Sequence, residues 1–318
     1  MMDAFGIGPT GEGAVRVGVL GRTAMLVNAA RAVADQGHQI SFVQTCGTGQ
    51  YHNAVQSDFA HLAANFDAPF MLGGSVRTTM AAWRDTGTEV CISINWPTLV
   101  PAEALEMLPH GILNAHAGDL PRYRGNACPN WAILNHEQQI GLTIHRMVPA
   151  LDAGPWLFKT FMPLDEDVYI GDVYAWLERT VPRAFCEAID RLKTTGFRDQ
   201  NSDIMPLRTF PRRPEDARID WKMCSRDILA LIRASSHPFD GAFTTLDQKR
   251  TVRIWRARTF SPPYDLLAVP GQVCMGQSGD PVIATADGMI LLEECNIDGE
   301  ALANAKHIIL RSLRNRLV

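Results

Sequence analysis

Residues 15–45, VRVGVLGRTAMLVNAARAVADQGHQISFVQT, decide the fold class. The apolar run 15–20 ends at Gly21 and predicts a buried strand, and residues 39–45 predict a second one. Between them, four apolar residues recur at helical spacing before Gly37, which is typical of a helix end: Leu26, Ala29, Ala30 and Val33. A strand, a helix and a second strand in this order indicate a parallel sheet.

The next hundred residues continue the alternation of strands and helices. Helices are expected at about 52–65 and 76–85, and strands at 89–95 and 111–116. Two further strands are expected at 140–148 and 155–164, followed by a long amphipathic helix at 171–195. This order predicts an α/β domain whose sheet is covered on both faces.

The composition and the pattern of expected elements change after about residue 200. A polar segment rich in Pro and Arg precedes short strand-like runs that are separated by turn signals, which is typical of a small β-barrel or sandwich. Four parts are therefore expected along the chain: a loose leader at 1–14, the α/β domain at 15–200, a linker at 201–215 and a β-rich domain at 216–318.

Composition excludes several classes of protein. The 318 residues carry a net charge of −4, so no global electrostatic attraction to nucleic acid or to an anionic membrane is expected. The cysteine count of 7 is odd and contains no C-x-x-C, which argues against a disulfide framework or a zinc cluster and favours a reducing cytoplasm. No apolar run reaches the ~20 residues that a spanning helix needs.

Common catalytic motifs of α/β proteins are missing. The turn after the first strand reads GVLGRTAM and lacks the G-x-G-x-x-G of a dinucleotide site. The P-loop pattern and the G-x-S-x-G nucleophile elbow are missing as well. Hydride transfer, phosphoryl transfer and serine hydrolysis therefore lose support.

A polar cluster stands at the end of the 111–116 strand. Asn114 and His116 are two residues apart on an extended segment, so their side chains leave the same face. Asp152, in the turn between two later strands, can supply a carboxylate. An amide and an imidazole can stabilise an oxyanion while a carboxylate takes a proton, which suits acyl transfer to an amine without a covalent intermediate.

Residues 114–156, NAHAGDLPRYRGNACPNWAILNHEQQIGLTIHRMVPALDAGPW, resemble the folate-dependent formyltransferase family. The family pattern of N-x-H, L-P-x-Y-R-G, W-A-I-x-N, G-x-T-[IL]-x-x-M and D-x-G is present in order and at family spacing. Weaker resemblance extends over the N-terminal part and from residue 218 onward. It implies a Rossmann-like parallel-sheet catalytic domain followed by a small C-terminal β-barrel of OB-like type.

The resemblance also implies the reactants and the site. The donor would be N10-formyltetrahydrofolate, the acceptor a primary amine, and no metal would be needed. The catalytic triad falls on Asn114, His116 and Asp152. The pterin pocket falls on two segments, with these residues expected to bind the co-substrate: Ile94, Asn95, Trp96, Leu151, Asp152 and Gly154.

The acceptor expected from the sequence is a nucleotide-linked amino sugar, with a 4-amino-deoxy sugar of lipopolysaccharide biosynthesis as the example. LTIHRM and YRGNACPNWAI look most like that branch, and Arg122, Asn126 and His145 are the expected substrate contacts. Residues 216–318 hold 13 Lys or Arg against 12 Asp or Glu, so a nucleic-acid partner is not favoured.

Other possibilities remain open. The chain can act on methionyl-tRNA, or it can hydrolyse formyltetrahydrofolate with water as acceptor. It can also be an RNA-binding module on an inactive α/β scaffold, because such barrels bind oligonucleotides. A homodimer without membrane contact is expected.

Overall fold

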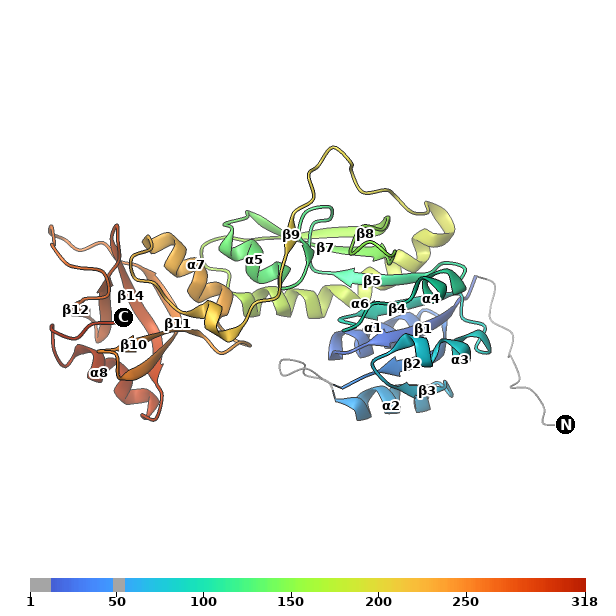
Figure 1. The fold of residues 1–318 in the computed structure, drawn as a ribbon, viewed down its shortest axis with the longest axis horizontal. Coiled ribbons are helices and arrows are strands. Elements are labelled where there is room, and N and C mark those ends of the chain that lie inside the picture. Colours follow the sequence, from blue (N-terminus) through green and yellow to red (C-terminus); the bar gives the residue numbers. More distant parts are fainter. Residues whose placement is uncertain (1–12, 48–54) are drawn as a thin grey trace. The chain divides into compact units, whose positions relative to one another are not determined.

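The computed structural model describes residues 13–47 and 55–318. The expected leader at 1–14 therefore lies outside the described residues except for its last two positions. By spatial contacts the chain forms two compact units (Figure 1). The first comprises the described residues up to 125, with 141–162 and 175–208, and the second comprises 126–140, 163–174 and 209–318. The boundaries expected at 201–215 remain a prediction.

A seven-stranded sheet forms the centre of the first unit, with strand order β3-β2-β1-β4-β5-β7-β8. The strands are β1 (Arg16–Gly21), β2 (Gln39–Thr45), β3 (Phe70–Leu72), β4 (Val90–Ile94), β5 (Ile112–His116), β7 (Gln139–Arg146) and β8 (Trp156–Pro163). The pairs from β3 to β5 are parallel, as expected, whereas β5 pairs with β7 in antiparallel fashion. The predicted α/β fold class is thus confirmed.

Helices and short 3-10 turns connect these strands (Figure 1). They are α1 (Ala24–Asp35), α2 (Gln56–Asn65), η1 (Val76–Thr78), α3 (Met80–Arg84) and α4 (Ala102–Met107). The long helix α6 (Ile170–Thr194) follows β8, and its first residues belong to the second unit. The four apolar residues that predicted α1 are fully buried, which explains why this stretch folds as a helix against the sheet. The chain runs outward from β1 to β3 and returns to β4 beside β1, so β1 and β4 form the topological switch point of the sheet.

The second unit contains the predicted β-rich domain. Its five-stranded antiparallel sheet has the order β10-β11-β14-β13-β12. The strands are β10 (Ala242–Leu246), β11 (Arg250–Thr259), β12 (Val273–Gln277), β13 (Asp280–Ala284) and β14 (Met289–Ile297). The helical elements of this unit are α5 (Cys128–Leu134), η2 (Pro214–Ala217), α7 (Ser225–Ser235), η3 (Leu302–Asn304) and α8 (Ala305–Leu310). A two-residue pair joins β6 (Arg124–Gly125) to β9 (Arg208–Thr209).

The last residues of the chain close the five-stranded sheet into a barrel. Val318 exchanges two backbone hydrogen bonds with Thr245, beside the β10 edge, at 2.9 Å each. On the other edge, the Leu317 N–H donates to Gly271 O at 2.8 Å. A Cβ on Gly271 would lie 2.0 Å from Leu317 O, so this approach requires glycine. Closure leaves the barrel with an apolar interior that includes Ile254 and Ile290.

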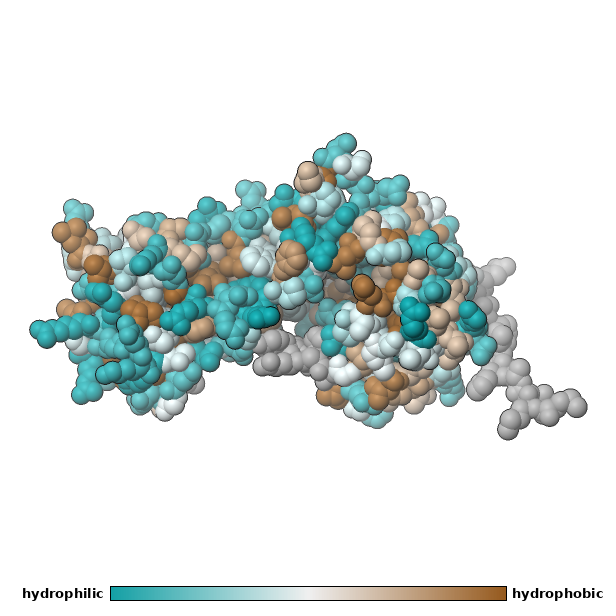
Figure 2. All heavy atoms as spheres, viewed as in Figure 1, coloured by the Kyte–Doolittle hydropathy of each residue, from teal (hydrophilic) through white to brown (hydrophobic). Residues whose placement is uncertain are grey.

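None of the described helices combines the length and hydropathy needed to cross a bilayer. The face drawn in Figure 2 mixes hydrophilic and hydrophobic residues. Large hydrophobic side chains with high exposure include Leu99, Met205 and Leu267, which lie far apart in the sequence. The compartment stays a prediction.

Candidate active site

Three neighbouring strands place polar side chains in one row at the carboxyl edge of the sheet. Ser93 on β4 is the register partner of Asn114 on β5, and Asn114 is in turn the partner of His145 on β7. His116 follows two residues after Asn114 and therefore leaves the same face. The expectation that Asn114 and His116 point together is fulfilled, and the antiparallel β7 adds His145 to the row.

His116 is held by a backbone carbonyl. Its Nε2 lies 2.6 Å from Tyr123 O, and because a carbonyl only accepts, Nε2 is the donor. Tyr123 has a φ of +57°, so the chain reverses there and turns this carbonyl back toward the strand end. A Cβ on Gly118 would lie 2.7 Å from His116 Nε2, which explains the glycine in this turn. The Nδ1 edge of the same ring faces Asp152 Oδ2 at 3.7 Å.

Asp152 comes from the turn between β7 and β8, as predicted, and joins the two histidines. Its Oδ2 accepts the Gly125 N–H at 2.9 Å, and its Oδ1 lies 3.6 Å from His145 Nε2. Asp152 has a φ of +50°, and a Cβ on Gly154 would lie 1.9 Å from Arg146 O. The Asp-Ala-Gly turn therefore folds tightly enough to bring its carboxylate back over the strands.

His145 has a fixed protonation pattern. Its Nδ1 donates to Arg146 O at 3.1 Å, so Nε2 is the acceptor for the Asn114 amide at 3.2 Å. The ring is 1% exposed, and burial lowers its pKa to about 4, with the nearby His116 as the second cause. His145 is therefore neutral near pH 7 and orients the Asn114 side chain. It was expected to contact substrate, but the described contacts are all within the cluster.

The residues expected to bind the pterin extend along the same edge. The loop after β4 meets the loop after β1, where the Arg22 N–H donates to Ile94 O and Arg22 Nε donates to Asn95 O, both at 3.1 Å. A Cβ on Gly21 would lie 2.2 Å from Ile94 O, so this close approach requires glycine. Trp96 Nε1 in this loop is buried and has no hydrogen-bond partner among the described residues.

The orphaned polar groups fit a polar, ring-shaped ligand. Ser93 Oγ, beside Asn114, is the second buried atom of this edge that lacks a partner in the described part of the chain. Buried donors without partners are rare in folded proteins, and a bound molecule is one way to satisfy them. The structure thus agrees with a heterocyclic co-substrate bound near Ser93 and Trp96.

Sequence reasoning missed three groups that hold the site together. The Tyr123 carbonyl and the Gly125 N–H are backbone groups, whose roles no residue type reveals. Gln200 donates from Nε2 to Asp152 O at 2.7 Å and to Gly154 O at 2.9 Å. Gln200 lies 48 residues after Asp152, and no spacing signal connects the two.

The other residues expected to bind substrate or co-substrate make no hydrogen bond described above for the cluster of Asn114, His116, His145 and Asp152. The Arg122 guanidinium stands 5.6 Å from the centre of the Tyr123 ring. Leu151 is partly exposed in the β7–β8 turn. Asn126 belongs to the second unit, where its N–H donates to Thr209 O at 3.3 Å. Roles for these residues in binding remain predictions.

The cluster also has the composition of a metal site. One ligand-type atom each from His116, His145 and Asp152 lies within 4.8 Å of the others. Both histidines donate their other ring N–H to a backbone carbonyl, an arrangement that is common around metal ligands. The sequence led us to expect no metal, and that stays a prediction.

Comparisons with known proteins place this cluster in a family. Residues 75–189 match the family described as "Formyl transferase", and residues 212–312 match "Formyl transferase, C-terminal domain". A curated relative from Pelobacter propionicus, named methionyl-tRNA formyltransferase, is 28% identical over 276 residues, or 85% of each chain. A protein of the same name from Geobacter metallireducens is 29% identical over 234 residues, or 72% of each chain.

Solved structures share the fold at lower identity. An N-formyltransferase from Helicobacter canadensis, in complex with folinic acid and dTDP-3-aminofucose, is 18% identical with a TM-score of 0.63, covering 87% of this chain and 98% of its own. HypX from Aquifex aeolicus, in complex with tetrahydrofolic acid, is 18% identical with a TM-score of 0.61 and covers 89% of this chain. The chain spans less than half of the length of HypX, at 44%.

The expectation of a nucleotide-linked amino sugar as acceptor is wrong. The two curated relatives named above carry the name methionyl-tRNA formyltransferase, and the sugar enzymes are similar in fold alone. The expected link to lipopolysaccharide biosynthesis is therefore not supported either. The structure supplies the reason: the motifs that suggested a sugar contain Tyr123 and His145, whose hydrogen bonds hold the polar side chains at the carboxyl edge of the sheet together. Such residues carry no information about the acceptor.

The two matched regions, the folate-containing neighbours and the Asn114–His116–Asp152 cluster agree with one another. The expected transferase activity and the expected formyl-folate co-substrate are thereby confirmed. The chain belongs to the folate-dependent formyltransferase family and is an N-formyltransferase with a formyl-folate co-substrate.

Proposed function

We propose that the chain formylates the amino group of methionyl-tRNA and that Asn114, His116 and Asp152 carry the transfer. The observation that supports this acceptor is the match to two curated methionyl-tRNA formyltransferases across 72% and 85% of the chain. The expectation against a nucleic-acid partner, which rested on average charge, is given up with the sugar. The homodimer stays a prediction.

The first requirement of the reaction is a donor to the formyl oxygen. When the acceptor nitrogen attacks the formyl carbon, this oxygen becomes negative. An Asn amide nitrogen carries two hydrogens. In Asn114 one of them is directed at His145 Nε2, 3.2 Å away, and the second can donate to the oxyanion. His116 Nδ1 faces Asp152 Oδ2 at 3.7 Å, and a proton on this nitrogen would give the ring a positive charge at the same place.

The second requirement is a path for the proton of the amine. The neutral amine attacks, its new C–N bond forms, and the nitrogen becomes positive until it loses a proton. The Asp152 carboxylate can take that proton directly or through a water molecule. Collapse of the intermediate breaks the bond between the formyl carbon and N10, and the proton is finally delivered to N10. The products are the formylated amine and tetrahydrofolate.

Burial strengthens the electrostatic effect of Asp152 and His116 on the reacting groups. Asp152 and His116 have side-chain exposures of 10% and 7%, so little water screens their charges. Hydrogen bonds from Gly125 and to Tyr123 fix both groups before substrate arrives. Preorganised donors of this kind typically contribute roughly 10²–10³-fold to the rate.

The test is tetrahydrofolate release from N10-formyltetrahydrofolate with methionyl-tRNA as acceptor, together with detection of the N-formyl product. N-acetylmethionyl-tRNA is the matched control, because its amine is blocked while its RNA is unchanged. We expect release with methionyl-tRNA alone. Equal release with the blocked RNA or without RNA would show hydrolysis, and no release with methionyl-tRNA would contradict the proposal.

A further inference from the structure

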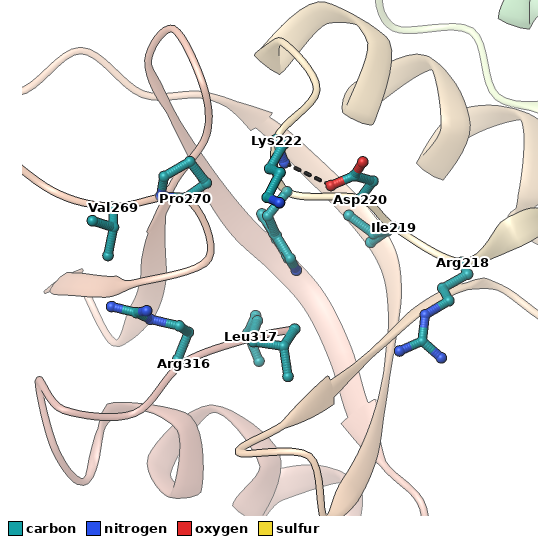
Figure 3. A pocket seen from close by; sticks show the side chains of 10 residues that line it. Arg218, Ile219, Asp220, Lys222, Val269, Pro270, Arg316 and Leu317 are labelled. Carbon is teal, nitrogen blue, oxygen red and sulfur yellow. Dashed lines mark hydrogen bonds between the residues drawn. The ribbon is translucent and has the colours of Figure 1, made fainter.

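A cavity of about 480 Å³ opens in the C-terminal barrel, apart from the triad. Three segments line it: 218–222, 269–270 and 316–318 (Figure 3). In the view of Figure 3, Arg218 and Arg316 stand on opposite sides, with Lys222 above them. The volume lies within the range of ~300–1,000 Å³ that is typical of small-molecule sites.

Hydrogen bonds hold the lining segments in place. The Ile219 N–H donates to Phe243 O at 2.8 Å, which fixes the first segment on the barrel. Trp221 Nε1 donates to Thr244 Oγ1 at 3.0 Å, and the same hydroxyl donates to Val318 O at 3.0 Å. One threonine therefore links the first and the last segment, so the cavity is formed before any ligand binds.

The cationic side chains around the cavity lack partners. Arg218, Lys222 and Arg316 make no side-chain hydrogen bond or ion pair in the described part of the chain, and all three are exposed. Asp220 Oδ1 accepts the backbone N–H of Lys222 at 2.9 Å (Figure 3). Four other cations of the barrel form ion pairs: Arg250 with Glu300, Arg253 with Asp298, Arg258 with Glu293 and Lys306 with Asp280.

The chemistry of the lining matches a molecule with two kinds of surface. Ile219, Val269, Pro270 and Leu317 give apolar walls that can pack against a flat ring. Two guanidinium groups and an ammonium group suit a phosphate, to which Arg binds in bidentate fashion. We propose that this cavity binds a nucleoside phosphate, with the phosphate between the arginines and the base against the apolar walls.

The same chemistry has two sources, a free nucleotide and a nucleotide within an RNA strand. The inference goes beyond the proposed function, because it concerns a binding site and no catalytic step. The measurements below record binding alone, so their failure can be told apart from a failure to formylate methionyl-tRNA.

The first experiment measures AMP binding to the full-length protein by equilibrium dialysis. We expect adenosine and inorganic phosphate each to bind at least about tenfold more weakly than AMP, because each lacks one half of the recognised chemistry. Arg218→Ala and Arg316→Ala should each weaken AMP binding by about tenfold or more. Arg314→Ala, an exposed arginine of the same C-terminal segment that does not line the cavity, is the matched control.

A competition experiment then separates the sources. Displacement of AMP by a short single-stranded RNA or by methionyl-tRNA supports the RNA-borne nucleotide, and binding of AMP without such displacement supports the free one. Absence of AMP binding at millimolar concentration would overturn the inference. So would phosphate binding as tight as AMP binding, or equal binding by the two cavity variants and Arg314→Ala. Unchanged thermal melting of each variant excludes misfolding as the cause of weak binding.

Discussion

The two units bury different kinds of polar group. Three histidines are buried among the described residues, and all of them lie in the first unit: His38, His116 and His145. The buried polar side chains of the second unit are hydroxyls and amides, such as Thr244 and Asn130, that bond to backbone carbonyls. The first unit thus buries imidazole rings, whereas no described histidine of the second unit is buried.

This difference indicates which unit can support proton-transfer chemistry and which can support binding through surface charges. A desolvated imidazole or carboxylate reacts strongly to its neighbours, so chemistry that moves protons belongs in the first unit. Exposed charges are screened and contribute little to stability, so their arrangement matters chiefly for binding. Changes in the first unit should therefore alter turnover and pH dependence, and changes in the barrel should alter stability or binding.

The largest expected effect follows from Asp152→Asn. The amide keeps an oxygen for the Gly125 N–H but loses the charge and the proton acceptor. We expect kcat/KM for formyl transfer to fall by roughly 10²–10⁴-fold, the size typical of acid–base groups. Asp298→Asn, which removes the partner of Arg253 on the barrel, is the matched control and should leave kcat/KM unchanged. Full activity of Asp152→Asn would remove Asp152 from the triad.

The next effect concerns the pH dependence of stability through His145. Its pKa is lowered to about 4 in the folded protein from 6.5, because burial disfavours the charged ring. The folded state therefore binds the proton more weakly than the unfolded state. The stabilising contribution is complete above pH 6.5 and is lost as pH falls toward 4, by roughly 3 kcal/mol in total.

The measurement is urea unfolding of the wild type and of His145→Leu between pH 7 and pH 4. We expect the wild type to lose stability over this range more steeply than the variant, so that their difference changes with pH. His61→Leu, on the exposed side of α2, should follow the wild type. Parallel curves for wild type and His145→Leu would show that burial of His145 does not shift its titration.

The sequence predicted those parts of the fold and of the candidate site that depend on residues close together in the chain. The period of two residues put Asn114 and His116 on one face, and helical spacing found α1, because both patterns depend on neighbouring residues alone. The residues alone offered Asp152 as a possible carboxylate, and its place in a triad needed the family resemblance. Tyr123, Gly125 and Gln200 escaped prediction, because their roles arise from chain reversals and from contacts between distant segments. Average charge is a weak guide to a nucleic-acid partner, since it hides which cations are paired.

The third prediction concerns Gly21, which ends β1 at the topological switch point of the sheet. In Gly21→Ala the new Cβ would stand 2.2 Å from Ile94 O, at a φ of +152° that L-residues rarely adopt. We expect the free energy of unfolding to fall by about 2 kcal/mol or more, from overpacking and backbone strain together. The KM for the formyl donor should rise, because the loop of Asn95 and Trp96 must move.

Gly37→Ala separates strain from overpacking. Gly37 has a φ of +89°, but a Cβ there would meet no atom within 4 Å. We expect a smaller loss of about 1 kcal/mol and an unchanged KM. Equal losses for the two variants would show that the contact with Ile94 does not matter.

The last prediction concerns the barrel and separates its role from that of the first unit. Thr244→Val keeps the shape of the side chain but removes the hydroxyl between Trp221 Nε1 and Val318 O. A buried indole N–H then lacks its partner, so we expect a loss of about 1–2 kcal/mol in stability by urea unfolding, with kcat unchanged. Thr251→Val, on β11, is the control, because its hydroxyl makes no hydrogen bond among the described residues. If Thr244→Val lowered kcat without lowering stability, the barrel would take part in the chemical step, and the division between the units would fail.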